Sequence, residues 1–179
     1  MKKLLLLLTL TLTLSCCNKD DNPFSSNETL PPETQTGANT VGCLVNGEVY
    51  LPSQRGLNPP VNCLYEYDNG EFYFTLAFED MKNFGPTVSI HTGRLTLVAG
   101  QTYLLNKNSV TDGDYTGGGA SYFPSLQNFY YTNTTKTGEL KITRLDLQNS
   151  IISGTFWFDA INSAGETVQI RSGRFDMHY

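Results

Sequence analysis

EFYFTLAFE, residues 71–79, alternates large apolar side chains with smaller or polar ones. Phe72, Phe74, Leu76 and Phe78 fall on one face of an extended strand, because successive side chains of a strand point to opposite faces. The stretch therefore predicts a β-strand that turns one face toward a core.

Similar short runs and turn signals occur along most of the chain. Asn46-Gly47 and Asp68-Asn69-Gly70 each separate two runs and predict β-hairpins, because these residues accept the positive φ of tight turns. We expect about ten short strands among the runs 41–45, 48–51, 62–67, 71–79, 87–92, 94–98, 102–105, 129–133, 140–147, 153–161, 167–170 and 174–179, with a loop at 106–119. This spacing predicts an all-β fold, an antiparallel β-sandwich, with a closed lipocalin-like β-barrel as the alternative. Trp157 is expected in the core of a second sheet, with a second exposed aromatic as the alternative.

Composition agrees with an all-β fold, and the charge argues against one class of partner. The chain has 10 Tyr, 10 Phe and 16 Gly, and charged residues make up only 16%. Aromatic residues suit pleated sheets and glycine suits turns. The net charge is −5, and near −7 once Lys2 and Lys3 are removed with a signal segment. A chain this acidic, without a Lys/Arg cluster, is not expected to bind nucleic acid.

The first seventeen residues, MKKLLLLLTLTLTLSCC, carry an export signal. Two lysines, an apolar run and a small residue before a cysteine resemble a bacterial lipoprotein signal, with 1–15 as the signal peptide. The resemblance implies that Cys16 receives the lipid, with Cys17 as the alternative, and that lipid chains anchor the protein without a membrane-spanning helix. Residues 19–21, Lys-Asp-Asp, resemble the surface-export signal of Bacteroidota lipoproteins, which implies an outer-membrane protein exposed at the surface (alternatively facing the periplasm).

Residues 16–40 are polar and show no hydrophobic period. They predict a lipidated, flexible tether in front of a single domain at 41–179.

Cys43 and Cys63 are the two cysteines beyond the anchor. In an oxidising compartment such a pair predicts a disulfide, with two buried free thiols as the alternative. Their spacing does not fit a zinc site.

GELKITRLDLQNSIISGTFWFDAINSAGETVQIRSGRFDMHY, residues 138–179, and TQTGANTVGCLVNGEVYLP, residues 34–52, resemble the two ends of an uncharacterised family of Bacteroidota envelope lipoproteins. Members share an ISGTFxFxAxNxxGExVxIxxGxFDxxY ending. The resemblance implies membership and no activity, since the family has no assigned function.

Few residues form a pattern suited to catalysis or metal binding. His178 is expected on a solvent face with Arg174 and Asp176, and no G-x-S-x-G turn supplies a nucleophile. Asp112, Asp114 and Thr116 match the opening of a calcium loop, but Phe123 stands where the bidentate Glu belongs, so a plain Asp/Gly-rich turn is the preferred interpretation. The sequence predicts no catalytic residue, no metal site and no cofactor.

Five aromatic residues crowd one region: Tyr122, Phe123, Phe129, Tyr130 and Tyr131. Exposed aromatics bind partners, whereas strand alternation would bury about half of them. They are the candidate ligand-binding residues.

The resulting functional hypothesis is a membrane-anchored envelope lipoprotein with a non-catalytic binding or structural role. Its expected partners are the membrane, through the lipid, and a glycan or protein ligand. Alternatives are a lipocalin-like carrier of a small apolar ligand and a hydrolase with an unrecognised carboxylate site.

Overall fold

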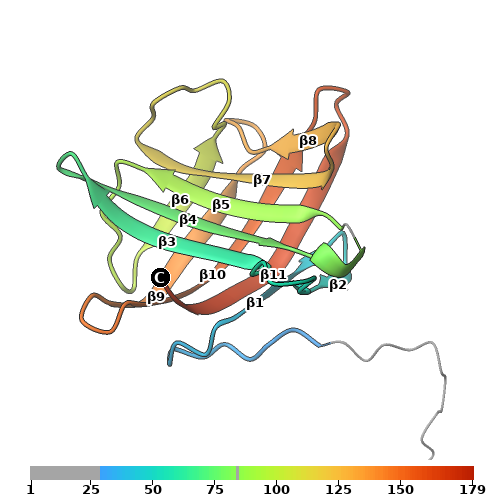
Figure 1. Cartoon of the computed structure of the whole chain (residues 1–179). Helices are drawn as coiled ribbons and strands as arrows, with labels where there is room; N and C mark the ends of the chain where they lie inside the picture. Colours follow the sequence, from blue (N-terminus) through green and yellow to red (C-terminus); the bar gives the residue numbers. More distant parts are fainter. Residues whose placement is uncertain (1–28, 84) are drawn as a thin grey trace, which may run out of the picture.

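The computed structural model of the protein describes residues 29–83 and 85–179, and strands dominate both stretches. Figure 1 shows them as an all-β fold. The elements are β1 (Thr40–Val45), β2 (Glu48–Tyr50), β3 (Val61–Asp68), β4 (Glu71–Glu79), the short 3-10 turn η1 (Met81–Asn83), β5 (Thr87–Gly93), β6 (Thr102–Lys107), β7 (Gly117–Ser125), β8 (Asn128–Tyr131), β9 (Gly138–Asp146), β10 (Ile151–Ile161) and β11 (Thr167–His178).

All eleven strands belong to one mixed sheet that folds over on itself into two layers (Figure 1). The hydrogen-bonded order is β2-β1-β11-β10-β9-β6-β7-β5-β4-β3, and β8 pairs with both β7 and β10. Every pairing among these strands is antiparallel except β6 with β7. In the described chain β2 and β3 are the two ends of this path, so the sheet is a folded, sandwich-like β structure and not the closed barrel that was the alternative.

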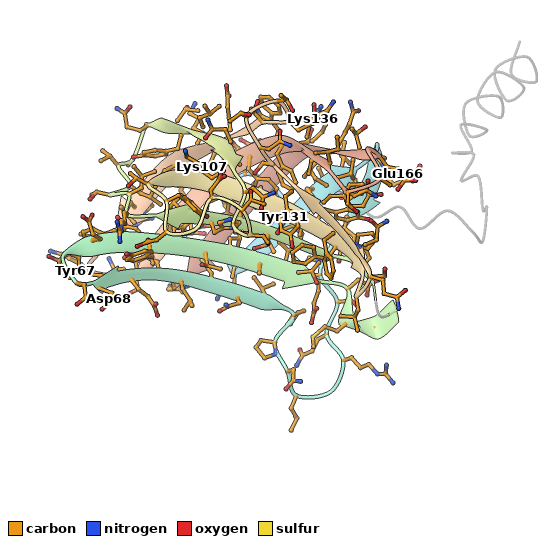
Figure 2. All side chains as sticks on the ribbon, turned by 90° about the horizontal axis from the view of Figure 1, so that it is seen from above. Tyr67, Asp68, Lys107, Tyr131, Lys136 and Glu166 are labelled. Carbon is orange, nitrogen blue, oxygen red and sulfur yellow. The ribbon has the colours of Figure 1, made fainter. Side chains whose placement is uncertain are left out.

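The hairpins form where the turn residues predict them. Asn46 and Gly47 have φ values of 50° and 93°, and Asn69 and Gly70 have 50° and 92°. Positive φ at both central residues is the requirement of a type I′ turn, whose twist matches that of the flanking strands. Figure 2 shows Asp68 at the tip of the β3–β4 hairpin, on the opposite side of the molecule from Glu166.

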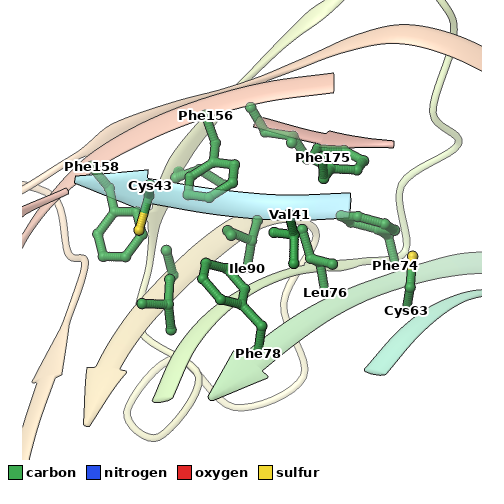
Figure 3. Close-up of a cluster of buried hydrophobic side chains, with 14 of the residues drawn as sticks. Val41, Cys43, Cys63, Phe74, Leu76, Phe78, Ile90, Phe156, Phe158 and Phe175 are labelled. Atoms are coloured by element: carbon green, nitrogen blue, oxygen red, sulfur yellow. The ribbon is translucent and has the colours of Figure 1, made fainter. Parts of the chain in front are cut away.

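The core lies between the two layers and is filled by side chains. In β4, Phe74, Leu76 and Phe78 are buried, which confirms the predicted period-two face. Rings from the other layer meet them, with Phe78 and Phe156 at 6.3 Å and Phe74 and Phe175 at 5.9 Å between centroids (Figure 3). The predicted all-β sandwich is confirmed, and the space that a carrier would need holds these side chains.

β7 is a strand that the sequence did not predict. Its first three residues fall in the expected loop at 106–119, because Gly117-Gly118-Gly119 looks like loop sequence. The glycines are needed for close packing, since a Cβ on Gly119 would lie 2.6 Å from the carbonyl oxygen of Lys107 on the parallel neighbour β6.

Residues 94–98 were expected to form a strand but are irregular. Arg94 has a φ of 48°, which takes the chain out of the extended conformation. The amide of Leu97 donates to the hydroxyl of Tyr65 at 3.0 Å, and Leu97 is buried. The segment therefore adds an apolar side chain to the core without joining the sheet.

The predicted disulfide between Cys43 and Cys63 is wrong. Both cysteines are free and buried, and burial raises the pKa of each thiol to about 12. Cys43 lies on β1 beside Phe158, whereas Cys63 lies on β3 at the far side of the cluster (Figure 3). The two strands belong to opposite layers of the core, and each thiol packs as a small apolar group.

The domain begins earlier than the predicted boundary at 41. Asp176 of β11 is 1% exposed and accepts hydrogen bonds from the amides of Thr36, Gly37 and Ala38 at 2.9, 2.8 and 3.1 Å. The hydroxyl of Thr34 adds a bond of 2.7 Å. Residues 34–38 are therefore bound to the sheet, and the last part of the predicted tether belongs to the folded domain.

Candidate functional site

The β7–β8 hairpin brings the five predicted aromatic residues together and divides them between two faces. Tyr122 and Tyr130 turn inward, where they pack against the core with 5.9 Å between ring centroids. Phe123 meets Phe129 at 5.2 Å and Tyr131 at 5.7 Å, both edge to face. Phe123, Phe129 and Tyr131 form what we call the aromatic triplet.

An open groove lies beside this triplet, between the β7–β8 turn and the start of β5. It has a volume of about 590 Å³ and is lined by Phe123, Pro124, Ser125, Leu126, Gln127 and Phe129 from the hairpin and by Glu79, Gly85 and Thr87 from the other side. We call it the hairpin groove. The hairpin turn and η1 both lie on the right of the molecule in Figure 1.

Apolar side chains at the hairpin groove are unusually exposed. Leu126 is 93% and Phe129 is 41% exposed. Exposed apolar groups that gather in one place mark binding surfaces more often than scattered ones do. Leu126 was not predicted as a site residue because it falls in a turn, where the one available signal was an apolar residue between Ser125 and Gln127.

Two adjacent carboxylates lie next to the hairpin groove. Glu79 and Asp80 both line a second open groove of about 500 Å³ with Arg55 and Met81. The Glu79 carboxylate accepts a bond of 3.3 Å from the hydroxyl of Thr87, and the Asp80 carboxylate accepts one from the hydroxyl of Ser53. Both carboxylates are thus bound by neighbouring hydroxyls.

The candidate calcium residues have other interactions. Asp112 accepts a bond of 2.8 Å from the amide of Asn108, and Asp114 forms an ion pair with Arg94. Thr116 is exposed. In the part of the chain that the structure describes, no group of three or more His, Cys, Asp or Glu could hold a metal ion.

The two histidines lie in different environments. His178 is exposed, as predicted, but Asp176 beside it is buried under residues 34–38 and not on the solvent face. His91 lies against Tyr115 with 6.0 Å between ring centroids, and burial lowers its pKa to about 4. Its buried Nε2 has no hydrogen-bond partner among the described residues.

Trp157 was expected in a sheet core, and that prediction is wrong. The indole lies on the outer face of β10 and is 36% exposed. A bulge in the pairing of β10 with β11 falls at this residue. Inward-facing Phe156 and Phe158 on either side fill the core instead.

The lipid-attachment candidates Cys16 and Cys17 and the export signal lie outside the described residues. Within 29–83 and 85–179, the structure has no helix of the length and apolarity needed to cross a membrane.

Comparison with known proteins places the chain in a family. Residues 86–177, about half the chain, match the family described as "Domain of unknown function (DUF6252)". The matched part runs from β5 to β11 and contains both the hairpin and Trp157. No curated protein and no solved structure matches the chain. The protein therefore belongs to the family of the DUF6252 domain of unknown function.

Proposed function

We propose that this protein is a lipid-anchored envelope protein with a non-catalytic role, and that its hairpin groove binds an apolar segment of a protein partner. The observation that carries the proposal is the exposure of Leu126 and Phe129 beside the aromatic triplet. The anchor at Cys16, the outer-membrane location and the surface exposure rest on the N-terminal signal alone.

The lining of the groove favours a protein over a glycan. Phe123, Pro124, Leu126 and Phe129 provide apolar surface, and the carboxylate of Glu79 is the one charged group in the lining. Interfaces between proteins are built around such aromatic and apolar anchors with few charges at their centre.

Neither alternative function is supported by the described residues. A carrier needs an interior cavity, and Phe74, Phe78 and Phe158 fill the space between the layers. A hydrolase needs convergent carboxylates, and Glu79 and Asp80 are bound to Thr87 and Ser53.

Leu126→Asp tests the proposal, because a charge at the rim opposes insertion of an apolar segment. Leu147→Asp is the matched control, since Leu147 is 65% exposed in the β9–β10 turn. Proteins crosslinked to the wild-type protein on intact cells are identified, and the affinity of the purified partner is measured for both variants. We expect at least about a tenfold loss for Leu126→Asp and no loss for Leu147→Asp. Equal binding by the wild type and the Leu126 variant contradicts the proposal.

A further inference from the structure

A third groove lies on the outer face of β6, β9, β10 and β11, away from the β7–β8 hairpin. It has a volume of about 350 Å³ and is lined by Glu33, Thr102, Glu139, Lys141, Thr155, Phe156, Trp157, Ser172, Gly173 and Arg174. We call it the Trp157 groove. Its lining is mostly polar, unlike that of the hairpin groove.

The indole of Trp157 is held in place from two sides. Its Nε1–H donates to the carboxylate of Glu139 at 3.3 Å, across the β9–β10 pair. The guanidinium of Arg171 lies 5.4 Å from the ring centroid and covers part of the indole. The side chain is therefore fixed before any ligand arrives, which lowers the entropic cost of binding.

Arg171 is itself fixed by three hydrogen bonds. It donates to the carbonyl oxygens of Phe158 and Ile170 at 3.1 and 2.9 Å and to the carboxylate of Asp159 at 2.5 Å. Trp157 is thus held by Glu139 and Arg171 while part of its apolar surface stays in water. Such a side chain is suited to contacting a ligand, because ligand binding would remove that surface from water.

Hydrogen-bonding groups along the groove are available. In the described chain the hydroxyls of Thr102, Thr155 and Ser172 have no protein partner, and neither has the ammonium of Lys141. The two carboxylates of the lining have partners, since Glu139 binds Trp157 and Glu33 lies 3.9 Å from Arg174. Lys141 is therefore the one charged side chain of the lining that has no partner among the described residues, in a lining whose two acidic and two basic side chains balance.

We propose that the Trp157 groove binds an acidic saccharide. The apolar C–H face of a sugar ring packs on the indole, its hydroxyls bond to the free threonine and serine hydroxyls, and its carboxylate pairs with Lys141. The groove lies at the lower end of the usual size range for small-ligand sites, which fits roughly one or two sugar rings. An apolar lipid would leave the free hydroxyls without partners.

Glu33, from the N-terminal segment, also lines this groove. Glu33 precedes the residues that bind Asp176, and its carboxylate faces Arg174 at the end of the groove. A saccharide bound there lies close to the point where the chain leaves the domain toward its anchor.

Tryptophan fluorescence tests the proposal directly, because Trp157 is the single tryptophan of the chain. The full-length lipoprotein in detergent micelles is titrated with a galacturonic acid trisaccharide and, for comparison, with a neutral galactose trisaccharide. We expect a saturable change of emission with the acidic sugar and at least about tenfold weaker binding of the neutral one.

Matched variants separate the groove from other effects. Lys141→Met should lower the affinity for the acidic trisaccharide by about tenfold or more, whereas Lys141→Arg should retain most of it. Lys82→Met, at an exposed lysine of η1, should leave the affinity unchanged. Leu126→Asp should bind the sugar as the wild type does, so failure at the hairpin groove would not imply failure here. The absence of a saturable change, equal affinity for both trisaccharides, or an equal loss in the Lys141 and Lys82 variants would overturn the proposal.

Discussion

His91 is a partly buried histidine whose buried Nε2 meets no hydrogen-bond partner among the described residues. It lies on β5 against Tyr115. A Cβ on Gly119 of the neighbouring strand would lie 2.8 Å from that nitrogen, so glycine there leaves the ring its space. Burial without a partner disfavours the protonated form and lowers the pKa of His91 to about 4 from 6.5.

This lowered pKa predicts a loss of stability in mild acid. The unfolded chain takes up a proton at His91 near its ordinary pKa, whereas the folded chain does not until the pH approaches 4, so stability falls as the pH drops through this window. Between about pH 7 and about pH 5 we expect His91 to account for about 1–2 kcal/mol of the free energy of unfolding. Urea unfolding at both pH values should show that His91→Gln loses this part of the pH dependence. His178→Gln, at the exposed histidine, should retain it, and an unchanged pH dependence in His91→Gln would contradict the assignment.

Residues 34–38 act as a structural element although they form no strand. Their backbone amides and hydroxyls surround one carboxylate, and the hydroxyl of Ser153 adds a bond of 2.7 Å from β10. Burial alone would raise the pKa of Asp176, but hydrogen bonds from Thr34, Ser153 and the backbone outweigh it and hold the pKa below its usual value. The carboxylate therefore joins the N-terminal segment to two adjacent strands.

Replacing this carboxylate should release the segment. Asp176→Ala leaves the amides of Thr36, Gly37 and Ala38 without their acceptor, which should lower the free energy of unfolding by about 3–5 kcal/mol. Hydrogen exchange at 36–38 should accelerate in the variant. Asp68→Ala, in the exposed turn of the β3–β4 hairpin (Figure 2), is the control and should change stability by less than about 0.5 kcal/mol. Slow exchange at 36–38 in Asp176→Ala would show that other contacts hold the segment.

Elements with strong local signals were predictable, and those that depend on distant neighbours were not. β4 follows from its alternation, and the Asn46-Gly47 and Asn69-Gly70 turns follow from their need for positive φ. β7 was not predicted, because its glycines are explained by the proximity of β6, which no local pattern encodes. Asp176 looked like a solvent-facing strand residue because its partners lie about 140 positions away.

The candidate site was predictable to a similar extent. The aromatic cluster could be named from the sequence because its members are close along the chain, although which rings turn outward needed the pairing of β7 with β8. The Trp157 groove could not be predicted, because it combines Glu33, Lys141 and Arg174 from separate parts of the chain. The disulfide failed for the same reason, since the count of cysteines does not reveal which layer each one enters.

At the scale of the whole molecule, the N-terminal signal predicts how the protein is held at the membrane. Cys16→Ala should move the protein from the membrane fraction to the soluble fraction, because the acyl chains supply the anchoring energy. Cys17→Ala should leave the protein in the membrane fraction. Immunoblots of separated fractions give the measurement, and membrane retention of Cys16→Ala would favour Cys17 or another anchor.

The boundary found at Thr34 also limits how far the domain can lie from its anchor. The chain between Cys16 and Thr34 cannot span more than roughly 60 Å even when fully extended. With the lipid at Cys16 as proposed, a partner of the hairpin groove or of the Trp157 groove would have to come close to the membrane.

The bonds around Asp176 also decide how the domain responds to mechanical force. Tension applied through the proposed lipid anchor would first meet the contacts of residues 31–38, which run to Asp176 and Arg174 of β11 and to Arg144 of β9. β11 is paired on both sides, by β1 and β10. The force is therefore shared by the hydrogen bonds that β11, an interior strand, makes with both of its neighbours, and it does not act on an edge strand alone. We expect the contacts around Asp176 to break before the strand pairing does, so that the sheet stays folded when the N-terminal segment is pulled away.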